Sequence, residues 1–388
     1  MNKNLYLDVH VLQTVPPSCV NRDDTGSPKT AVYGGVNRAR VSSQSWKRAM
    51  RLEFNHLFES EQIGFRTKNI KMLLVDRLKE LDTTKDLSTL EKIAEVALTE
   101  AKIKSSGGKK DVLFFISSKQ IDALAKLALE YSSDDSSKKE KDKKYKDKWR
   151  DALTNNPSVD ILLFGRMAAS DPELNFDAAA QVAHCISTHA VSNEFDYFTA
   201  VDDCNTDDNA GAGHLGTVEF NSSTLYRYST VNISELMENG LNIDEVSDVI
   251  NGYLQAFIKA MPTGKQNTFA NRTLPCFTYV TLREDQPVNM AGAFEKPVPK
   301  SSNGYEAKSI EAFIEYTKKV YLGQHPGLEV RRVRDEGHSA ASGSRPARHR
   351  RGSVRPRPPR HPRKDGRQVR GPRRDHSGAP RRHPEVAL

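Results

Sequence analysis

A short basic run from Val41 to Arg51 holds the residues best suited to binding chemistry. Apolar residues recur every three or four positions from Trp46 to Leu57, which predicts an amphipathic helix with one buried stripe. Lys47 and Arg51 would then lie one turn apart beside that stripe, near a helix start whose free N–H groups favour anions. Like charges at this spacing repel each other unless an anion relieves them, so the run favours phosphate binding. An ordinary basic surface helix is the alternative.

The residues around this run could extend a phosphate-binding track. Ser42 and Ser43 are both suited to cap the helix, and Gln44 supplies a further neutral donor. Nearby cations that could contact additional phosphates are Arg22, Arg38 and Arg40. The residue types therefore predict a phosphate cradle at the start of one helix.

Three pairs of neighbouring carboxylates could serve a different chemistry, a Mg²⁺ site for phosphodiester hydrolysis. They are Asp23-Asp24, Asp202-Asp203 and Asp207-Asp208. Each pair lies among turn-forming residues, where aspartate is common without function. The sequence also lacks the motifs of zinc proteases, nucleotide-binding loops and serine hydrolases. We therefore expect no catalytic residue, no metal and no cofactor.

Four cysteines are widely separated and form no CxxC pair, which suits reduced thiols in a cytosolic chain. They are Cys19, Cys185, Cys204 and Cys276. No apolar run approaches the roughly 18 residues that span a bilayer, and the start has no signal-peptide cleavage site. We expect a cytoplasmic protein that does not enter a membrane.

The chain has 388 residues, 37% of them hydrophobic and 28% charged, which allows one elaborated domain or two modest ones. Its net charge of +8 is unevenly distributed. Residues 323–388 hold 18 Lys and Arg against 6 Asp and Glu, so residues 1–322 carry a net charge of −4. A nucleic acid bound by this body must be held by a local group of cations.

Residues 323–388 also differ in composition from the rest. They contain no Phe, Trp or Tyr, and 17 of their 18 cations are Arg, so they cannot build a hydrophobic core. One interpretation is a disordered Arg-rich arm that binds nucleic acid, and the other is out-of-frame translation of GC-rich DNA. The second is favoured, because the body of the chain uses Lys freely.

Periodicity along the chain predicts an α+β fold with an antiparallel sheet and insertions. The expected strands are 5–11, ended by Pro16-Pro17, then 225–231 and 276–282. The expected helices are 70–81, 90–101, 120–131, 178–190 and 243–261. His184 and His189 would be packed, hydrogen-bonded residues of the helix at 178–190, because five-residue spacing does not place two ligands on one face. The polar segment 202–213 predicts a long hairpin tip.

Six segments match one known family in the same order along the chain. They are 18–24 (SCVNRDD), 33–35 (YGG), 40–51 (RVSSQSWKRAMR), 165–168 (GRMA), 196–203 (DYFTAVDD) and 214–217 (HLGT) with Glu219-Phe220. They closely resemble the backbone subunits of the type I-E CRISPR Cascade complex, the CasC family. The resemblance runs from about Leu5 to about Tyr321 and does not extend into the tail.

This resemblance implies an RRM-like (ferredoxin-like) antiparallel palm, a helical fingers insertion and a protruding thumb hairpin. The implied parts are 1–58 and 221–322 for the palm, 59–195 for the fingers with a Lys-rich loop at 132–148, and 196–220 for the thumb. Residues 323–388 would be a tail outside these parts.

The resemblance also implies which residues contact RNA. Those that would hold its backbone are Arg22, Lys29, Ser42, Gln44, Lys47 and Arg51, with Ser43 beside them. Met167 would press against a base, with core packing as its alternative role. The thumb would include Val201, Asp202, Asp203, His214 and Leu215.

The implied function is that of a non-catalytic RNA-binding subunit. Several copies would assemble along CRISPR RNA with other Cascade subunits and present the guide for pairing with target DNA in antiviral defence. The alternative is a metal-dependent ribonuclease of the type III backbone kind, acting through loop Asp residues. A third possibility is nonspecific nucleic-acid binding by the Arg-rich tail alone.

Overall fold

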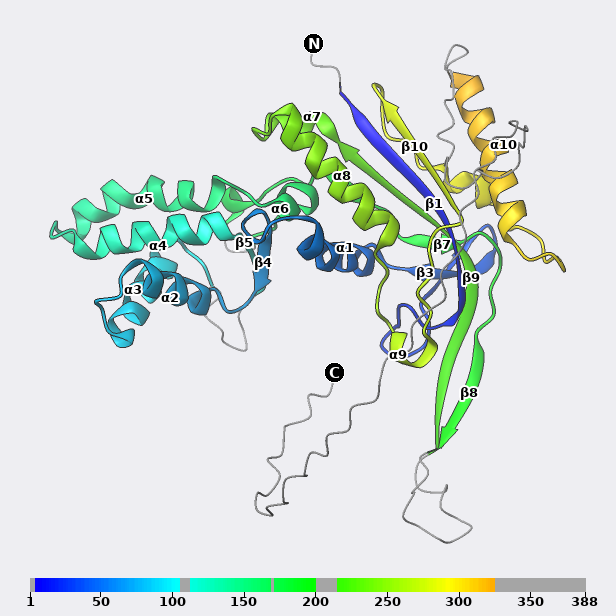
Figure 1. Cartoon of the computed structure of the whole chain (residues 1–388), viewed down its shortest axis with the longest axis horizontal. Coiled ribbons are helices and arrows are strands. Elements are labelled where there is room, and N and C mark those ends of the chain that lie inside the picture. Colours follow the sequence, from blue (N-terminus) through cyan, green and yellow to red (C-terminus); the bar gives the residue numbers. More distant parts are fainter. Residues whose placement is uncertain (1–3, 105–111, 169–170, 200–214, 325–388) are drawn as a thin grey trace, which may run out of the picture. The chain divides into compact units, whose positions relative to one another are not determined.

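The computed structural model describes residues 4–104, 112–168, 171–199 and 215–324 (Figure 1). All of them belong to the first of two units into which the chain divides, residues 1–329. The second unit, residues 330–388, lies outside the described residues, so the two interpretations of the Arg-rich tail stay open.

An antiparallel sheet forms the framework of the described chain. Its strands are β1 (Tyr6–Ser18), β2 (Thr30–Tyr33), β3 (Val36–Val41), β6 (Ala180–Val182), β7 (Cys185–Ser187), β8 (Glu194–Thr199), β9 (Leu215–Asn232) and β10 (Phe277–Arg283). The order is β10-β1-β9-β7-β3-β2, and β6 and β8 also pair with β9 (Figure 1). The predicted α+β class with an antiparallel sheet is confirmed.

Alternating side chains give this sheet two packed faces. The covering helices are α1 (Ser43–Leu57), α7 (Ile233–Glu238), α8 (Ile243–Lys259), α9 (Gln266–Phe269), α10 (Glu306–Gln324) and the 3-10 helix η3 (Met290–Phe294). Leu7, Val9 and Val11 of β1 pack with apolar residues of α1, α7 and α8. Leu12 joins the core beneath η3 and α10 on the opposite face. The start of α1 therefore lies on one defined face of the sheet.

A helical region with its own small sheet interrupts the strands. Its elements are η1 (Ser60–Gln62), β4 (Gly64–Thr67), α2 (Ile70–Leu81), α3 (Leu87–Glu100), β5 (Phe114–Ser117), α4 (Ser118–Ser133), α5 (Lys138–Thr154), α6 (Val159–Phe164) and η2 (Pro172–Leu174). Leu74, Leu78, Leu124 and Trp149 are buried in one core between these helices. The predicted helices at 70–81, 90–101 and 120–131 are confirmed. The second begins earlier, at Leu87, and ends at Glu100, and the third is longer at both ends.

The Lys-rich stretch at 132–148 is not a loop for most of its length, because α5 begins at Lys138. Ser137 and Glu140 form a reciprocal capping box at its start. Tyr145, Trp149 and Leu153 then form a buried stripe. The stripe is spaced by four residues and is hidden among lysines, which is why composition favoured a loop.

The helix expected at 178–190 is wrong. These residues form β6 and β7, which both pair with β9. Small side chains such as those of Ala180 and Ser187 fit a strand buried against the long β9, so pairing overrides their helix propensity. His189 is hydrogen-bonded as predicted, since its Nε2 accepts from the Thr224 amide at 3.1 Å.

The prolines at 16 and 17 do not end the first strand. β1 continues to Ser18, with a shift of register against β9 between Val15 and Ser18. Proline is tolerated at such an irregularity because its missing N–H removes no regular ladder bond. The extra residues carry the strand to the loop that bears Arg22.

No helix within the described ranges is both long enough and apolar enough to cross a bilayer.

Candidate nucleic-acid interface

The start of α1 is fixed by a cap and by a buried tryptophan. Of the two predicted caps, Ser42 holds the position, and its hydroxyl accepts from the Ser45 amide at 3.3 Å. The Trp46 indole N–H donates to the Cys185 thiol at 3.2 Å. The Arg227 guanidinium lies 3.7 Å from the centre of the indole ring. These contacts attach the helix start firmly to the sheet.

The loop after β1 brings two cations to this helix start. The Ser42 amide donates to the Asn21 side-chain oxygen at 2.9 Å, and the Lys29 amide donates to the Asn21 carbonyl at 2.8 Å. Arg22 and Pro28 form an antiparallel bridge across the loop. The loop is therefore hydrogen-bonded to the helix, and Arg22 remains exposed.

His184 connects Arg40 with α1. The Ser43 amide donates to His184 Nδ1 at 3.3 Å, and Arg40 Nη1 lies 3.4 Å from the same nitrogen. Partial burial lowers the pKa of His184, and the charges of Arg40 and Lys29 lower it further. The ring is therefore neutral at pH 7, and it accepts a hydrogen bond from an amide at the positive end of the helix.

Lys47 is half-buried beside an aromatic ring. Its ammonium lies 5.6 Å from the centre of the Phe164 ring, and burial lowers its pKa. Gln44, one turn earlier, is exposed. An anion at Lys47 would offset the cost of burying this charge.

Arg51 differs from the expectation because it already has a carboxylate partner. Its Nε donates to Asp160 at 3.1 Å, and its guanidinium lies 4.4 Å from the centre of the Phe115 ring. The Arg51 side chain is 22% exposed and that of Asp160 only 3%. Repulsion between Lys47 and Arg51 is thus relieved by Asp160, and the spacing argument for phosphate does not hold for this pair.

Four cations of the predicted set lack such a partner among the described residues. Within the described ranges no carboxylate forms a salt bridge with Arg22, Lys29, Arg40 or Lys47. We call these four residues, with Ser42 and Ser43, the cation cluster. It concentrates positive charge on a body whose net charge is negative.

Arg38 does not extend this cluster. It is fully buried and donates to the carbonyls of Ser187 at 3.0 Å and Phe294 at 2.8 Å. Arg38 and Arg40 share one face of β3, opposite Ala39 and Val41, and Arg38 differs from Arg40 because η3 covers it. Its role is to join η3 to the sheet.

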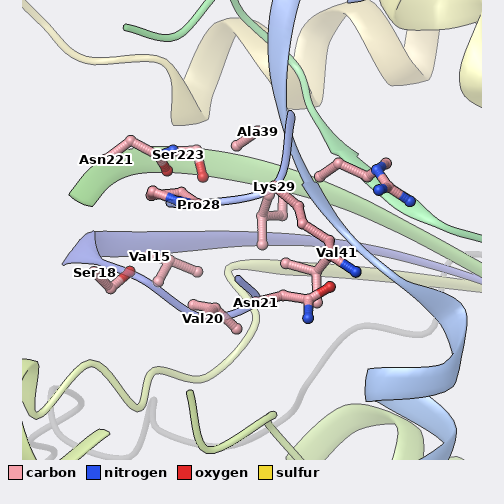
Figure 2. Close-up of a pocket in the computed structure, with 12 residues that line it drawn as sticks. Val15, Ser18, Val20, Asn21, Pro28, Lys29, Ala39, Val41, Asn221 and Ser223 are labelled. Carbon is pink, nitrogen blue, oxygen red and sulfur yellow. The ribbon is translucent and has the colours of Figure 1, made fainter. Parts of the chain in front are cut away.

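A small cavity of about 20 Å³ opens beside the cation cluster (Figure 2). Its walls come from the ends of β1 and β3, from the middle of β9 and from the loop after β1. The lining residues include the cations Lys29 and Arg40 and the polar residues Ser18, Asn21, Asn221 and Ser223. A space of this size holds about one water-sized group.

Met167 is 82% exposed, so core packing is not its role. The preceding Arg166 is buried and donates to the carbonyls of Leu174 and Leu153, at 2.8 and 2.7 Å. It also contacts the Phe115 carbonyl at 3.3 Å, on the strand that carries the ring beneath Arg51. Arg166 thus anchors the segment from which Met167 projects.

The expected thumb is described only at its base. β8 pairs with β9 from Glu194 opposite Phe220 to Thr199 opposite Leu215, as a hairpin that extends away from the sheet (Figure 1). Three aromatic residues of β8 are at least half exposed: Phe195, Tyr197 and Phe198. The predicted thumb residues Val201, Asp202, Asp203 and His214 lie outside the described residues.

Asp23 has a structural role. Its carboxylate accepts from the amides of Thr25 at 2.9 Å and Ser27 at 3.0 Å, which closes a turn in the loop after β1. Hydrogen bonds from Thr25 and Ser27 lower its pKa. Within the described ranges no three His, Cys, Asp or Glu side chains lie close enough together to hold a metal ion.

Sequence reasoning missed the residues that hold the interface together. Asp160, Arg166 and Arg227 are buried charges that fix Arg51, Met167 and Trp46. The available signal was a charged residue inside an apolar run, as in Val159 to Phe164. Such a residue predicts a buried partner but does not identify it.

The fold and these contacts define an α+β protein with a local group of cations at a helix start and a projecting aromatic hairpin. The sequence from residue 7 to 344 matches the model of the CT1975-like proteins, a Cas protein family, and the chain belongs to this family. The match extends beyond Tyr321, where the resemblance read from the sequence ended. No curated protein matches the chain.

Two solved structures are similar to this chain. One is described as "CRISPR RNA-guided surveillance complex, pre-nicking", with 33% identity over 82% of this chain and 89% of that chain, and a TM-score of 0.72. The other is described as "CRISPR RNA-guided surveillance complex", with 29% identity over 82% of this chain and 85% of that chain, and a TM-score of 0.53.

Proposed function

We propose that this protein is a non-catalytic backbone subunit that binds CRISPR RNA in a surveillance complex. The observation that carries the proposal is the cation cluster, in which four cations without salt bridges in the described chain surround a helix start. The similarity to chains of RNA-guided surveillance complexes supports RNA as the anion. Cations on the backbone and apolar faces against bases suit a single strand of any sequence.

In this proposal the complex is of type I-E and the sheet is an RRM-like palm. The helical region acts as fingers and the β8–β9 hairpin as the base of a thumb. Several copies line up on one RNA in the cytoplasm, and Met167 and the exposed aromatic residues of β8 contact bases. The guide then pairs with target DNA.

Binding to a labelled single-stranded RNA over a range of salt concentrations tests the proposal. The variant Lys29→Gln/Lys47→Gln should bind more weakly, and its salt slope should fall by about 0.7 for each lost phosphate contact. Lys318→Gln/Lys319→Gln is the matched control, since these exposed cations lie on α10 across the sheet. Unchanged affinity and slope in the first variant would show that the cluster is not the interface.

The non-catalytic part of the proposal has its own test. Labelled RNA incubated with the protein and Mg²⁺ should remain intact. Specific cleavage that disappears in Asp24→Ala would instead establish the ribonuclease alternative.

A further inference from the structure

We infer that the cavity beside the cation cluster reads a ribose 2′-hydroxyl, so that the protein prefers RNA to DNA through Ser18 and Ser223. The inference rests on the proposed function, since it assigns a subsite to the same bound strand.

The shape of the cavity selects a very small group. Val15, Val41 and Leu225 contribute apolar walls that also belong to the core around Trp46. Ser18 and Asn221 face each other where the end of β1 pairs with the middle of β9, with Ser223 nearby on β9 (Figure 2). A volume of about 20 Å³ admits a hydroxyl and excludes a base or a whole phosphate.

The hydrogen-bonding capacity of the walls matches a hydroxyl. Ser18 and Ser223 are 3% and 7% exposed, and their hydroxyls form no hydrogen bond with the described residues and are open to the cavity. The two amides are already engaged, since Asn221 donates to Asn193 at 3.0 Å and Asn21 accepts from Ser42 at 2.9 Å. The free groups can therefore both donate and accept, as a 2′-hydroxyl can.

The position of the cations favours ribose at this place. Lys29 and Arg40 line the same cavity and form no salt bridge in the described chain. A phosphate held by these cations brings its attached sugar next to the two serines. A deoxyribose offers no hydroxyl to these serines, so DNA forgoes the hydrogen bonds that RNA gains here.

Binding of the full chain to two labelled oligonucleotides of one sequence, single-stranded RNA and DNA, tests the inference. The wild-type protein should prefer RNA, and Ser18→Ala and Ser223→Ala should each lose roughly 2- to 10-fold in RNA affinity. DNA affinity should not change, so the ratio of RNA affinity to DNA affinity should decrease in both variants. Ser222→Ala, an exposed neighbour on β9, should leave the ratio at the wild-type value.

A ligand-side measurement does not depend on how the variants fold. RNA carrying 2′-O-methyl groups should bind the wild-type protein more weakly than RNA, because the methyl group does not fit the cavity. Equal binding of RNA and DNA, or an unchanged ratio in both serine variants, would overturn this inference while nucleic-acid binding stands. Failure to bind either strand would overturn the proposed function as well.

Discussion

Asp160 is a buried carboxylate that joins three elements beside the cation cluster. Its carboxylate accepts from Arg51, from the Gly64 amide at 2.9 Å and from the Ser158 hydroxyl at 2.6 Å. These contacts join α1, the strand β4 and the start of α6. A charge that sequence patterns place in an apolar run is thus the link between two separate cores.

Replacing this carboxylate with an amide should destabilise the protein. Asp160→Asn removes the countercharge of Arg51 and should lower the free energy of unfolding by about 2 kcal/mol. This is less than the roughly 3–5 kcal/mol of a fully buried pair, because Arg51 still reaches water. Urea unfolding measures the change. Glu95→Gln, which breaks an exposed pair with Lys71, is the control and should change little.

His10 should make the protein sensitive to acid. It is buried among aromatic rings beneath α10, and burial lowers its pKa to about 3. His10 takes up a proton near pH 6.5 in the unfolded chain but stays neutral in the folded chain until the pH approaches 3. Its contribution to the free energy of unfolding is therefore complete above pH 6.5 and decreases as the pH falls towards 3. For this one proton the free energy of unfolding changes by about 1.4 kcal/mol per pH unit.

The variant His10→Asn isolates this contribution. It should be less stable than wild type at pH 7, because the contact of His10 Nδ1 with the Tyr226 hydroxyl at 2.9 Å is altered. Its unfolding free energy should fall less steeply between pH 6.5 and 4. Parallel pH profiles of the two proteins would show that His10 is not the titrating group.

The turn of the β2–β3 hairpin contains two glycines whose contributions to stability can be compared. Gly34 and Gly35 form its turn and both have positive φ, +60° and +79°. A Cβ on Gly34 would collide with the Glu295 carbonyl, whereas a Cβ on Gly35 meets nothing within 4 Å. The first glycine is therefore needed for space as well as for conformation.

These two glycines provide a matched pair of variants. Gly35→Ala should cost about 1 kcal/mol of unfolding free energy from backbone strain alone. Gly34→Ala should cost about 3 kcal/mol or more, because the clash with the Glu295 carbonyl after η3 is added. Thermal unfolding measures both. Equal costs would mean that the segment after η3 moves away without loss.

Elements with a clear period were predictable, and elements defined by distant partners were not. The pattern of α2 gives its bounds, because its apolar residues repeat at helical spacing. β6 and β7 have three residues each and form by pairing with distant strands, β9 for both and also β3 for β7. In the candidate site, likewise, the local run around Lys47 was predictable from the sequence. The partners of Arg51 and Arg38, about 109 and 149 positions away, were not predictable.

Across the whole chain, the distribution of positive charge offers two different places for a polyanion to bind. Residues 323–388 hold 18 cations, against a net charge of −4 for the rest of the chain. Polyanion binding through the tail would depend strongly on salt and would not require α1. Binding through the cation cluster would require α1 and not the tail.

Two truncations separate these mechanisms. A chain of residues 1–344 keeps the whole family match and loses 15 of the 18 tail cations, while residues 1–324 end with α10. Both should bind RNA with the affinity and salt slope of the full chain if the cation cluster is the interface. A large decrease in the salt slope of RNA binding in the 1–344 chain would assign binding to the Arg-rich tail. A loss that begins only in 1–324 would place a required contact within 325–344, in the part of the family match that follows α10.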